Sequence, residues 1–197
     1  PYVDKMLKAY DLNHTYLECD DSILIGALFD AVCAKDMPGM TDVDASLLYF
    51  CRLVKEQNKV ALTGECADEI FGGYPWFYRE ELLNSDSFPW SVDLSARTLL
   101  LSDEFRSRLD IEAFVRSRYE ESVALVPYLD GETAEEKQRR KVSYLNLNWF
   151  MQTLLERMDR TSMYCGLEAR VPYADHRIVE YLYNVPWRMK YQNGVEK

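Results

Sequence analysis

The chain has few of the residues that build metal centres and disulfide frameworks. Its 197 residues include only two histidines, His14 and His176, so no zinc ligand set can be proposed. The five cysteines are odd in number and widely scattered, and no two of them form a C-x-x-C pair. We therefore expect reduced thiols and a cytoplasmic protein.

Long apolar runs and an excess of positive charge are also lacking. The longest apolar run, residues 23–33, is interrupted by Gly26 and Asp30 and is too short to span a bilayer, and no signal peptide is present. The formal charge of -10 argues against a nucleic-acid surface, because phosphate backbones require clustered Lys and Arg. The short basic cluster at residues 137–141 is most simply a solvated helix face. We expect neither a membrane nor a nucleic acid as partner.

The composition is that of a globular protein, with 48% hydrophobic and 13% aromatic residues. Asp20, Asp21 and Ser22 supply candidate caps for a helix that runs to about residue 35, and a second helix is expected over residues 43–57. Weak alternation at residues 15–19 suggests one strand, and residues 60–62 read as a short strand buried on both faces. The sequence predicts a helix-rich α/β fold containing part of a doubly wound parallel sheet, since a complete sheet normally has about five strands.

The chain changes character after Tyr74. Prolines and tryptophans mark an irregular excursion over residues 75–95, and helices then dominate over residues 94–119 and 135–160. Residues 142–158 are apolar on nearly every face, which predicts a buried helix. We therefore divide the chain into an α/β nucleotide-binding part, residues 1–75, and a mainly helical part, residues 76–197.

The most informative stretch is V-A-L-T-G-E-C-A-D-E-I-F-G-G-Y at residues 60–74, where an apolar strand opens into an acidic loop. Ligands of open α/β sheets bind outside the carboxyl ends of the strands, where Glu65, Asp68 and Glu69 fall. Magnesium is the natural counter-charge, because it takes oxygen ligands from one or two carboxylates plus nucleotide phosphates. An exposed acidic turn that caps a short helix explains the pattern equally well.

Three ordered blocks carry a family resemblance. T-G-E-C-A-D-E-I-F-G-G-Y, at residues 63–74, resembles the S-G-E-G-(S/A)-D-E-(I/V/L)-F-G-G-Y block of glutamine-dependent asparagine synthetases. L-L-E-R-M-D-R-T-S-M-Y-C-G-L-E-A-R-V-P-Y-A-D-H, at residues 154–176, resembles their L-L-x-R-x-D-R-x-S-M-x-x-G-L-E-A-R-V-P-F-x-D signature. G-V-E-K, at residues 194–197, resembles their G-x-E-K element. The likeness is to the C-terminal synthetase domain, an ATP pyrophosphatase of the adenine nucleotide alpha hydrolase type.

This resemblance implies ATP-dependent amidation of aspartate to asparagine. In that family the aspartate side chain reacts with ATP to form a β-aspartyl adenylate and pyrophosphate. Ammonia derived from glutamine then attacks the acyl carbon, and AMP is released as the amide forms. The implied cofactors are ATP and Mg²⁺, and the implied partner is an N-terminal glutaminase domain. A homodimer is left open.

The matched positions receive roles by resemblance. Glu65 is the expected acid/base partner of the attacking ammonia, and Asp68 the expected ligand of Mg²⁺ on the leaving pyrophosphate. Thr63 and Gly64 would bring their backbone near the nucleotide. Lys197 matches the lysine that stabilises negative charge in the transition states.

The roles of residues in the second block, and in the segment before the first strand, are left open. Asp159 and Arg160 either join a structural ion-pair network or contact substrate directly. Thr41 and Ser46 lie where the family places a phosphate-contacting T-T-x-R-A-S segment, but Asp44 stands where that arginine would be. Either Asp44 acts through metal, another cation replaces the arginine, or this branch of the family binds differently.

The family's S-G-G-(L/V)-D-S-S pyrophosphate loop and its cysteine-nucleophile domain both lie upstream of the matched region. We therefore expect this stretch to be a piece of a larger polypeptide that does not turn over alone. Two other readings stay open. One is a related amide-forming enzyme, of the β-lactam or lasso-peptide cyclase type, and the other is a non-catalytic binding domain that retains the fold.

Overall fold

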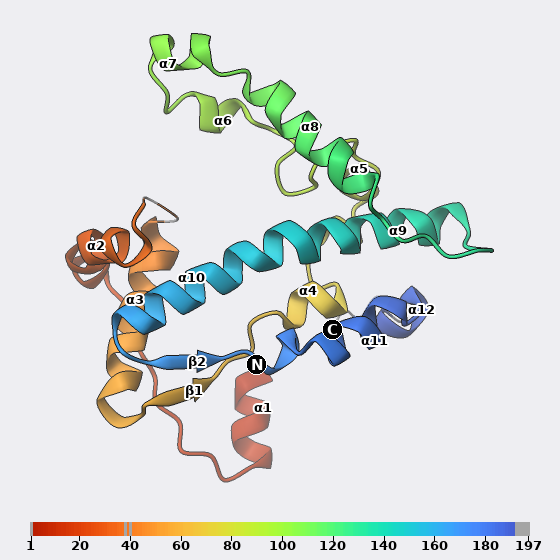
Figure 1. Cartoon of the computed structure of the whole chain (residues 1–197). Helices are drawn as coiled ribbons and strands as arrows, with labels where there is room; N and C mark the ends of the chain where they lie inside the picture. Colours follow the sequence, from red (N-terminus) through yellow and green to blue (C-terminus); the bar gives the residue numbers. More distant parts are fainter. Residues whose placement is uncertain (1, 38, 40, 192–197) are drawn as a thin grey trace. The chain divides into compact units, whose positions relative to one another are not determined.

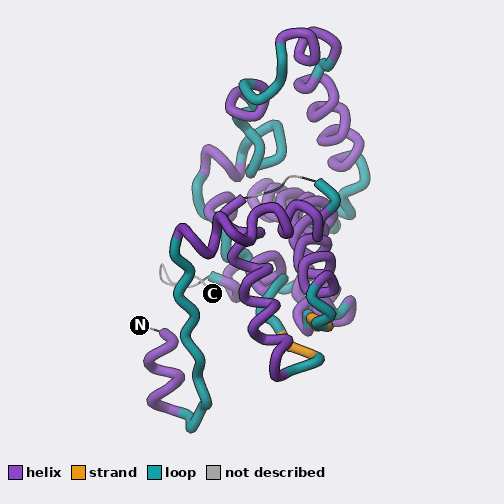
Figure 2. Tube along the Cα trace, turned by 90° about the vertical axis from the view of Figure 1, so that its left-hand side faces the viewer, coloured by secondary structure: helices purple, strands orange, loops and turns teal. Residues whose placement is uncertain are grey.

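The computed structural model describes residues 2–37, 39 and 41–191, and helices dominate that part of the chain (Figure 2). It divides into two compact units, which we describe separately. Unit 1 comprises residues 1–61 and 157–169, and unit 2 comprises residues 62–156 and 170–197.

Unit 1 contains the two helices that the sequence predicts before residue 60, and the structure confirms both. Its elements are α1 (Tyr2–Ala9), α2 (Asp21–Lys35), α3 (Thr41–Gln57) and the last part of α10 (Met151–Tyr164). Asp20 caps α2 by accepting the backbone N–H of Ile23 at 2.9 Å, and Asp36 ends that helix in the left-handed region with φ 61°.

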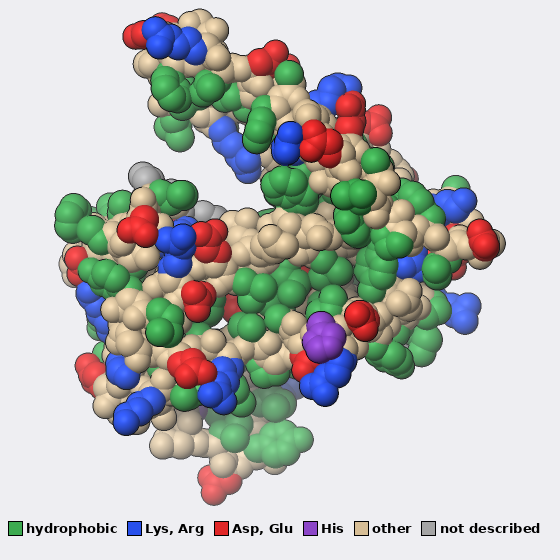
Figure 3. Space-filling model, viewed as in Figure 1, with side chains coloured by type: hydrophobic (Ala, Val, Ile, Leu, Met, Phe, Trp, Pro, Cys, Tyr) green, Lys and Arg blue, Asp and Glu red, His purple; other side chains and the backbone are tan. Residues whose placement is uncertain are grey.

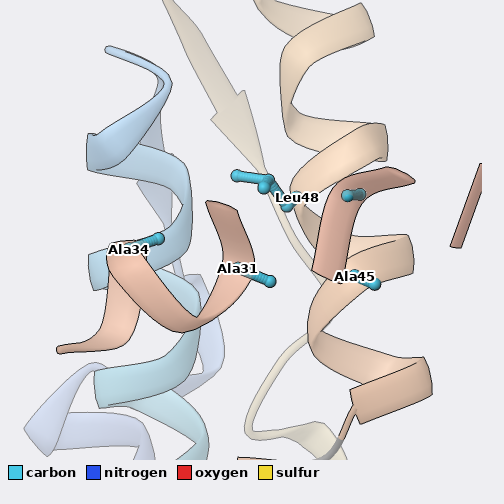
Figure 4. Packing of buried hydrophobic residues seen from close by; sticks show 5 residues of the cluster. Ala31, Ala34, Ala45 and Leu48 are labelled. Atoms are coloured by element: carbon cyan, nitrogen blue, oxygen red, sulfur yellow. The ribbon is translucent and has the colours of Figure 1, made fainter. Parts of the chain in front are cut away.

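Small side chains let α2 and α3 pack closely. Ala31 and Ala34 of α2 face Ala45 and Leu48 of α3, and Figure 4 shows these side chains at the contact. Leu48 is fully buried, and Ala45 is 1% exposed. This cluster is the core of unit 1.

The two strands β1 (Val60–Leu62) and β2 (Glu168–Arg170) form a two-stranded parallel sheet, labelled in Figure 1. Glu168 N donates to Lys59 O at 3.0 Å, and Thr63 N donates to Arg170 O at 2.9 Å. The predicted strand at 60–62 is confirmed, but its predicted burial on both faces is wrong, because Leu62 is 74% exposed. Within the described chain β1 has only β2 as a neighbour.

The strand expected at residues 15–19 is wrong. These residues form a loop between α1 and α2 in which Tyr16 is 72% exposed. Weak alternation without a partner strand does not hold an extended segment in a sheet.

Unit 2 is almost entirely helical. Short elements fill its first half: α4 (Ala67–Phe71), η1 (Pro75–Phe77), α5 (Glu80–Leu83), α6 (Ser95–Thr98) and α7 (Asp103–Arg108). Longer ones follow: α8 (Ile111–Val123), α9 (Ala134–Leu145), the π-helical turn η2 (Asn146–Phe150), the first part of α10, η3 (Pro172–Ala174), α11 (His176–Asn184) and α12 (Trp187–Lys190). The helices expected over 94–119 and 135–160 are thus present, with breaks that the sequence pattern did not reveal.

Aromatic packing forms the core of unit 2. Trp76 and Phe77 pack with Leu83 and Val142, and a neighbouring cluster joins Phe88, Tyr119 and Leu145. Tyr74, Trp90, Phe150 and Trp187 border the first cluster. The helix predicted over residues 142–158 is buried on one side only, because Trp149 is 40% exposed.

The basic cluster at residues 137–141 is not the solvated face that its pattern suggested. Arg139 and Arg140 side chains are only 17% and 8% exposed, and they pair with Glu135 and Glu132. The guanidinium of Arg139 also lies 4.6 Å over the ring of Trp187. The neighbouring helices α11 and α12, distant in sequence, cover this face of α9.

Charges of both signs are interspersed on the face shown in Figure 3, without a continuous basic field. Over the described residues, none of the helices combines the length and the apolar character that crossing a bilayer requires. All five cysteines are free, in agreement with the expectation of reduced thiols.

Candidate active site

The acidic loop follows β1 directly and is held by its own backbone. Thr63 to Cys66 lead into α4, which ends at Gly72 in the left-handed region with φ 79°. The N–H groups of Gly72 and Gly73 both donate to the carbonyl of Asp68 at 2.9 Å. A short helix thus begins at Ala67, and the two glycines follow its last residue, Phe71.

Both glycines are needed because other groups approach their backbone. A Cβ on Gly72 would lie 2.5 Å from Cη2 of Trp187, and a Cβ on Gly73 would lie 2.0 Å from Oδ1 of Asp68. The Asp68 side chain therefore lies over the backbone of Gly73, folded back onto its own loop.

Cys66 is the strained residue of this loop. It has φ 72°, in the left-handed region that L-residues other than glycine rarely adopt, at a cost of about 1–2 kcal/mol. Burial, with Glu69 and Glu65 nearby, raises the pKa of its thiol to about 12. The thiol is therefore not a nucleophile.

The three carboxylates of the loop have different environments. Glu69 is 3% exposed and accepts a hydrogen bond from the hydroxyl of Tyr74, and its backbone carbonyl accepts one from Nδ2 of Asn146 at 3.3 Å. Burial, followed by this contact with Glu69, raises the pKa of Tyr74 far above its usual range. Glu65 and Asp68 are half-buried. Glu69 thus anchors the loop, while the other two carboxylates keep access to solvent.

Tyr74 and Asn146 are contributors that sequence reasoning had not singled out. Tyr74 closes the G-G-Y motif, so the motif itself contained a usable signal. Asn146 is fully buried in η2, 77 residues from Glu69, and no local pattern connects the two. Its Oδ1 atom has no hydrogen-bond partner among the described residues.

The donor set suits a magnesium ion that is held mainly by phosphates. Within the described residues, no three His, Cys, Asp or Glu side chains gather into a metal-binding group. Mg²⁺ on a nucleotide needs only one or two protein carboxylates, since phosphates and water complete its octahedron. Asp68, a half-buried carboxylate beside glycine backbone, fits that requirement.

Thr41 and Ser46, which lie where the family places a phosphate-contacting segment, belong to unit 1. Thr41 begins α3, but its side chain lies outside the described residues. The Ser46 hydroxyl donates to the carbonyl of Val43 at 3.0 Å. Whether either contacts a phosphate stays a prediction.

Asp44, the departure from the family pattern, is paired inside unit 1. It is 3% exposed, and its Oδ2 lies 3.2 Å from Nζ of Lys35. A Cβ on Gly39 would lie 2.2 Å from the same oxygen, so backbone also covers the pair. Asp44 is committed to a buried lysine, which favours a structural role for it over the metal-mediated one.

Arg160 and Asp159 also lie in unit 1. Arg160 Nη1 lies 3.0 Å from Asp36 Oδ2 and donates to the carbonyl of Lys35 at 3.5 Å. Arg160 thus takes part in an ion pair, and whether it also contacts substrate stays a prediction. Asp159 is exposed, and its carbonyl accepts a bond from Ser162 Oγ at 3.2 Å. Lys197 lies outside the described residues.

The structure thus brings Thr63, Gly64, Glu65 and Asp68 together on one loop of unit 2. The remaining described candidates, Ser46, Asp159 and Arg160, belong to the other unit.

Comparison with known proteins shows which family the chain matches. A family model described as asparagine synthase matches residues 1–197. The chain is 48% identical over 197 residues to asparagine synthetase [glutamine-hydrolyzing] 3 of Bacillus subtilis (strain 168), covering 100% of this chain and 32% of that protein. It is 28% identical over 189 residues to asparagine synthetase [glutamine-hydrolyzing] 1 of the same organism, covering 80% of this chain and 30% of that protein. The chain spans about a third of the length of these curated relatives.

Proposed function

The chain belongs to the asparagine synthase family, and from that premise we propose that it carries the amidating part of a glutamine-hydrolysing asparagine synthetase. The reaction is the ATP-dependent amidation of aspartate through a β-aspartyl adenylate, with ammonia from glutamine. The observation that carries the proposal is the acidic loop, in which Glu65 and Asp68 keep solvent access while Glu69 is committed to Tyr74.

Glu65 is the proposed acid/base group. Its carboxylate is half-buried in the acidic loop, and a positioned carboxylate contributes on the order of 10²- to 10⁴-fold to rate. It would accept a proton from the nitrogen of the attacking ammonia, and would return that proton to AMP as the tetrahedral carbon collapses and expels AMP. Thr63 and Gly64 would supply backbone contacts to the nucleotide.

Asp68 is the proposed magnesium ligand. The ion, when bound, neutralises charge on the pyrophosphate that leaves. Support for this role comes from the position of the half-buried carboxylate, which lies over the backbone of Gly73. Lys197 is the proposed stabiliser of developing negative charge, as a compact cation aimed at an oxyanion.

The wider architecture is part of the same proposal. The small parallel sheet would belong to a doubly wound ATP pyrophosphatase fold, with residues 1–75 as its nucleotide-binding part and residues 76–197 as its helical part. The intact polypeptide would carry an N-terminal glutaminase domain and the pyrophosphate loop, function in the cytoplasm, and pair as a homodimer. Thr41 and Ser46 would contact phosphate, and Asp159 would contact substrate.

The test is product formation by the intact polypeptide that contains this chain. Incubation with ATP, Mg²⁺, aspartate and either glutamine or ammonia should yield AMP and asparagine in equal amounts. Asp68→Asn should raise the magnesium concentration needed for half-maximal rate or end turnover, whereas Asp130→Asn, an exposed acid in a distant turn, should leave the titration unchanged. AMP release with another carboxylic acid but not with aspartate would show a different amide-forming enzyme, and no AMP with any acid would overturn the proposal.

A further inference from the structure

The helical segment that precedes Lys197 packs against the end of α4. Trp187 of α12 fills the space next to Gly72, with ring atoms 2.5 and 2.6 Å from the position that a Cβ would take. The same ring stacks on Phe77, with centroids 5.5 Å apart and planes at 16°. This contact lies entirely within unit 2.

Lys190, one turn further along α12, makes a second contact with α4. Its Nζ donates to the backbone carbonyl of Ile70 at 3.2 Å. Ile70 follows Asp68 by two residues and Glu69 by one. Lys190 therefore touches the same short helix that carries the proposed magnesium ligand.

Two hollows flank the Lys190 side chain. A cavity of about 10 Å³, the size of one water, is lined by Lys190, Glu69, Ser143 and Tyr183. A larger cavity of about 200 Å³ is lined by Lys190 together with residues of α9 and α11. Lys190 thus lines both cavities.

The charges that face Lys190 are already committed to other partners. On α9 Arg139 pairs with Glu135, and Glu136 closes the helix cap with Thr133. Glu132 pairs with Arg140, while Glu69 of α4 accepts a hydrogen bond from the hydroxyl of Tyr74. Tyr183 of α11, the remaining ionisable group at the cavity, has its hydroxyl 3.5 Å from the carbonyl of Arg140.

No carboxylate within the described ranges pairs with Lys190. Burial, with a smaller contribution from Arg140, lowers the pKa of Lys190 to about 8. The fold therefore disfavours the cation at this position, and stability alone does not account for a lysine there.

We propose that Lys190 is a positioning residue that, together with Trp187, holds helix α4 and with it the acidic loop. The inference rests on the proposed function, because it gives Lys190 a role in placing Asp68, the proposed magnesium ligand on α4. A fixed α4 keeps that carboxylate in one orientation, which is an effect on orientation and not on substrate affinity.

The direct test is kinetic and uses the intact polypeptide. Lys190→Met keeps the length and apolar stem of the side chain and removes its N–H donors, whereas Lys190→Arg keeps a donor. Lys137→Met, at an exposed position of α9, is the matched control. We expect Lys190→Met to lower kcat for ammonia-dependent amide formation roughly tenfold or more, because misplacement of a reacting group costs rate. KM for ATP should stay within about twofold, since the lost contact acts in the transition state.

Lys190→Arg should recover most of the lost kcat, and Lys137→Met should equal the wild type. An unchanged kcat in Lys190→Met would overturn the proposal. Equal losses in the Met and Arg variants would also overturn it, because they would show that the site tolerates only the native shape. A rise in KM for ATP at constant kcat would assign Lys190 to substrate binding instead.

A second measurement separates this proposal from failure of the proposed function. Amide hydrogen exchange of residues 67–73 reports the attachment of α4 whether or not the protein makes asparagine. Lys190→Met should speed exchange there by at least about threefold and leave residues 21–35 unchanged. Exchange in α4 that equals the wild type would refute the attachment, even if the intact wild type proves to be an active asparagine synthetase.

Discussion

Replacement of Gly72 by alanine tests how closely α4 and α12 approach. Two costs follow from the structure. A left-handed φ of 79° costs an L-residue about 1–2 kcal/mol. A Cβ 2.5 Å from the Trp187 ring forces a shift in a packed cluster, which costs about 1–3 kcal/mol more. We therefore expect Gly72→Ala to lower the free energy of unfolding of this region by about 2–5 kcal/mol.

Gly131 provides a matched control for the backbone term. It has φ 81°, and a Cβ there would meet nothing within 4 Å. Gly131→Ala should therefore cost only about 1–2 kcal/mol. The difference between the two variants measures the steric term alone.

The assay is urea unfolding of the intact polypeptide, followed by hydrogen exchange of the peptide that spans residues 67–78. Exchange localises the loss to α4, where a loss of 2 kcal/mol corresponds to about 30-fold faster opening. In a Trp187→Leu background the cost of Gly72→Ala should fall toward that of the control, because the ring that it meets is gone. A Gly72→Ala cost no larger than that of Gly131→Ala would refute the close approach of Trp187.

Three further predictions concern other parts of the chain. Alkylation at pH 8 should modify the exposed Cys19 and leave Cys66 intact, because burial raises the pKa of Cys66 to about 12; mass spectrometry showing Cys66 modified first would contradict its environment. The pKa of Lys190 is lowered to about 8, so the folded state binds fewer protons than the unfolded state between about pH 8 and pH 10.4. The free energy of unfolding should therefore rise with pH across that window by up to about 3 kcal/mol relative to Lys190→Met, and parallel pH curves for the two proteins would exclude the shift. Asp44→Ala should lower the free energy of unfolding in urea by about 1–3 kcal/mol, because it removes the partner of the largely buried Lys35 side chain. Asp30→Ala, which breaks an exposed ion pair, should lower it by under about 1 kcal/mol. Equal costs would refute the burial argument.

Local signals in the sequence predicted local structure well. The helix cap predicted among Asp20, Asp21 and Ser22 depends on residues a few positions apart, and the structure confirms it at Asp20. The end of α4 at Gly72 and the cap of α11 by Asp175, which accepts the N–H of Arg177 at 2.9 Å, are equally local features. Caps and stops of this kind are decided within one helical turn, so a single sequence contains the information.

Features decided by distant neighbours could not be predicted. The basic run at 137–141 had the pattern of a solvated face, yet Arg140 is buried because α11 and Glu132 cover it. The Asp44–Lys35 pair and the contact from Asn146 to Glu69 join residues that no spacing rule links. The candidate site itself was predicted from ordered motifs. The structure adds that its carboxylates differ in environment, because Glu69 accepts a hydrogen bond from the Tyr74 hydroxyl.

The most direct measurement compares two reactions of the Glu65→Gln variant of the intact polypeptide. If Glu65 serves the attack of ammonia and not the activation of aspartate, aspartate-dependent exchange between ATP and labelled pyrophosphate should stay near the wild-type rate while asparagine formation falls by on the order of 10²-fold or more. Asparagine formation at the wild-type rate would contradict the central role assigned to the acidic loop.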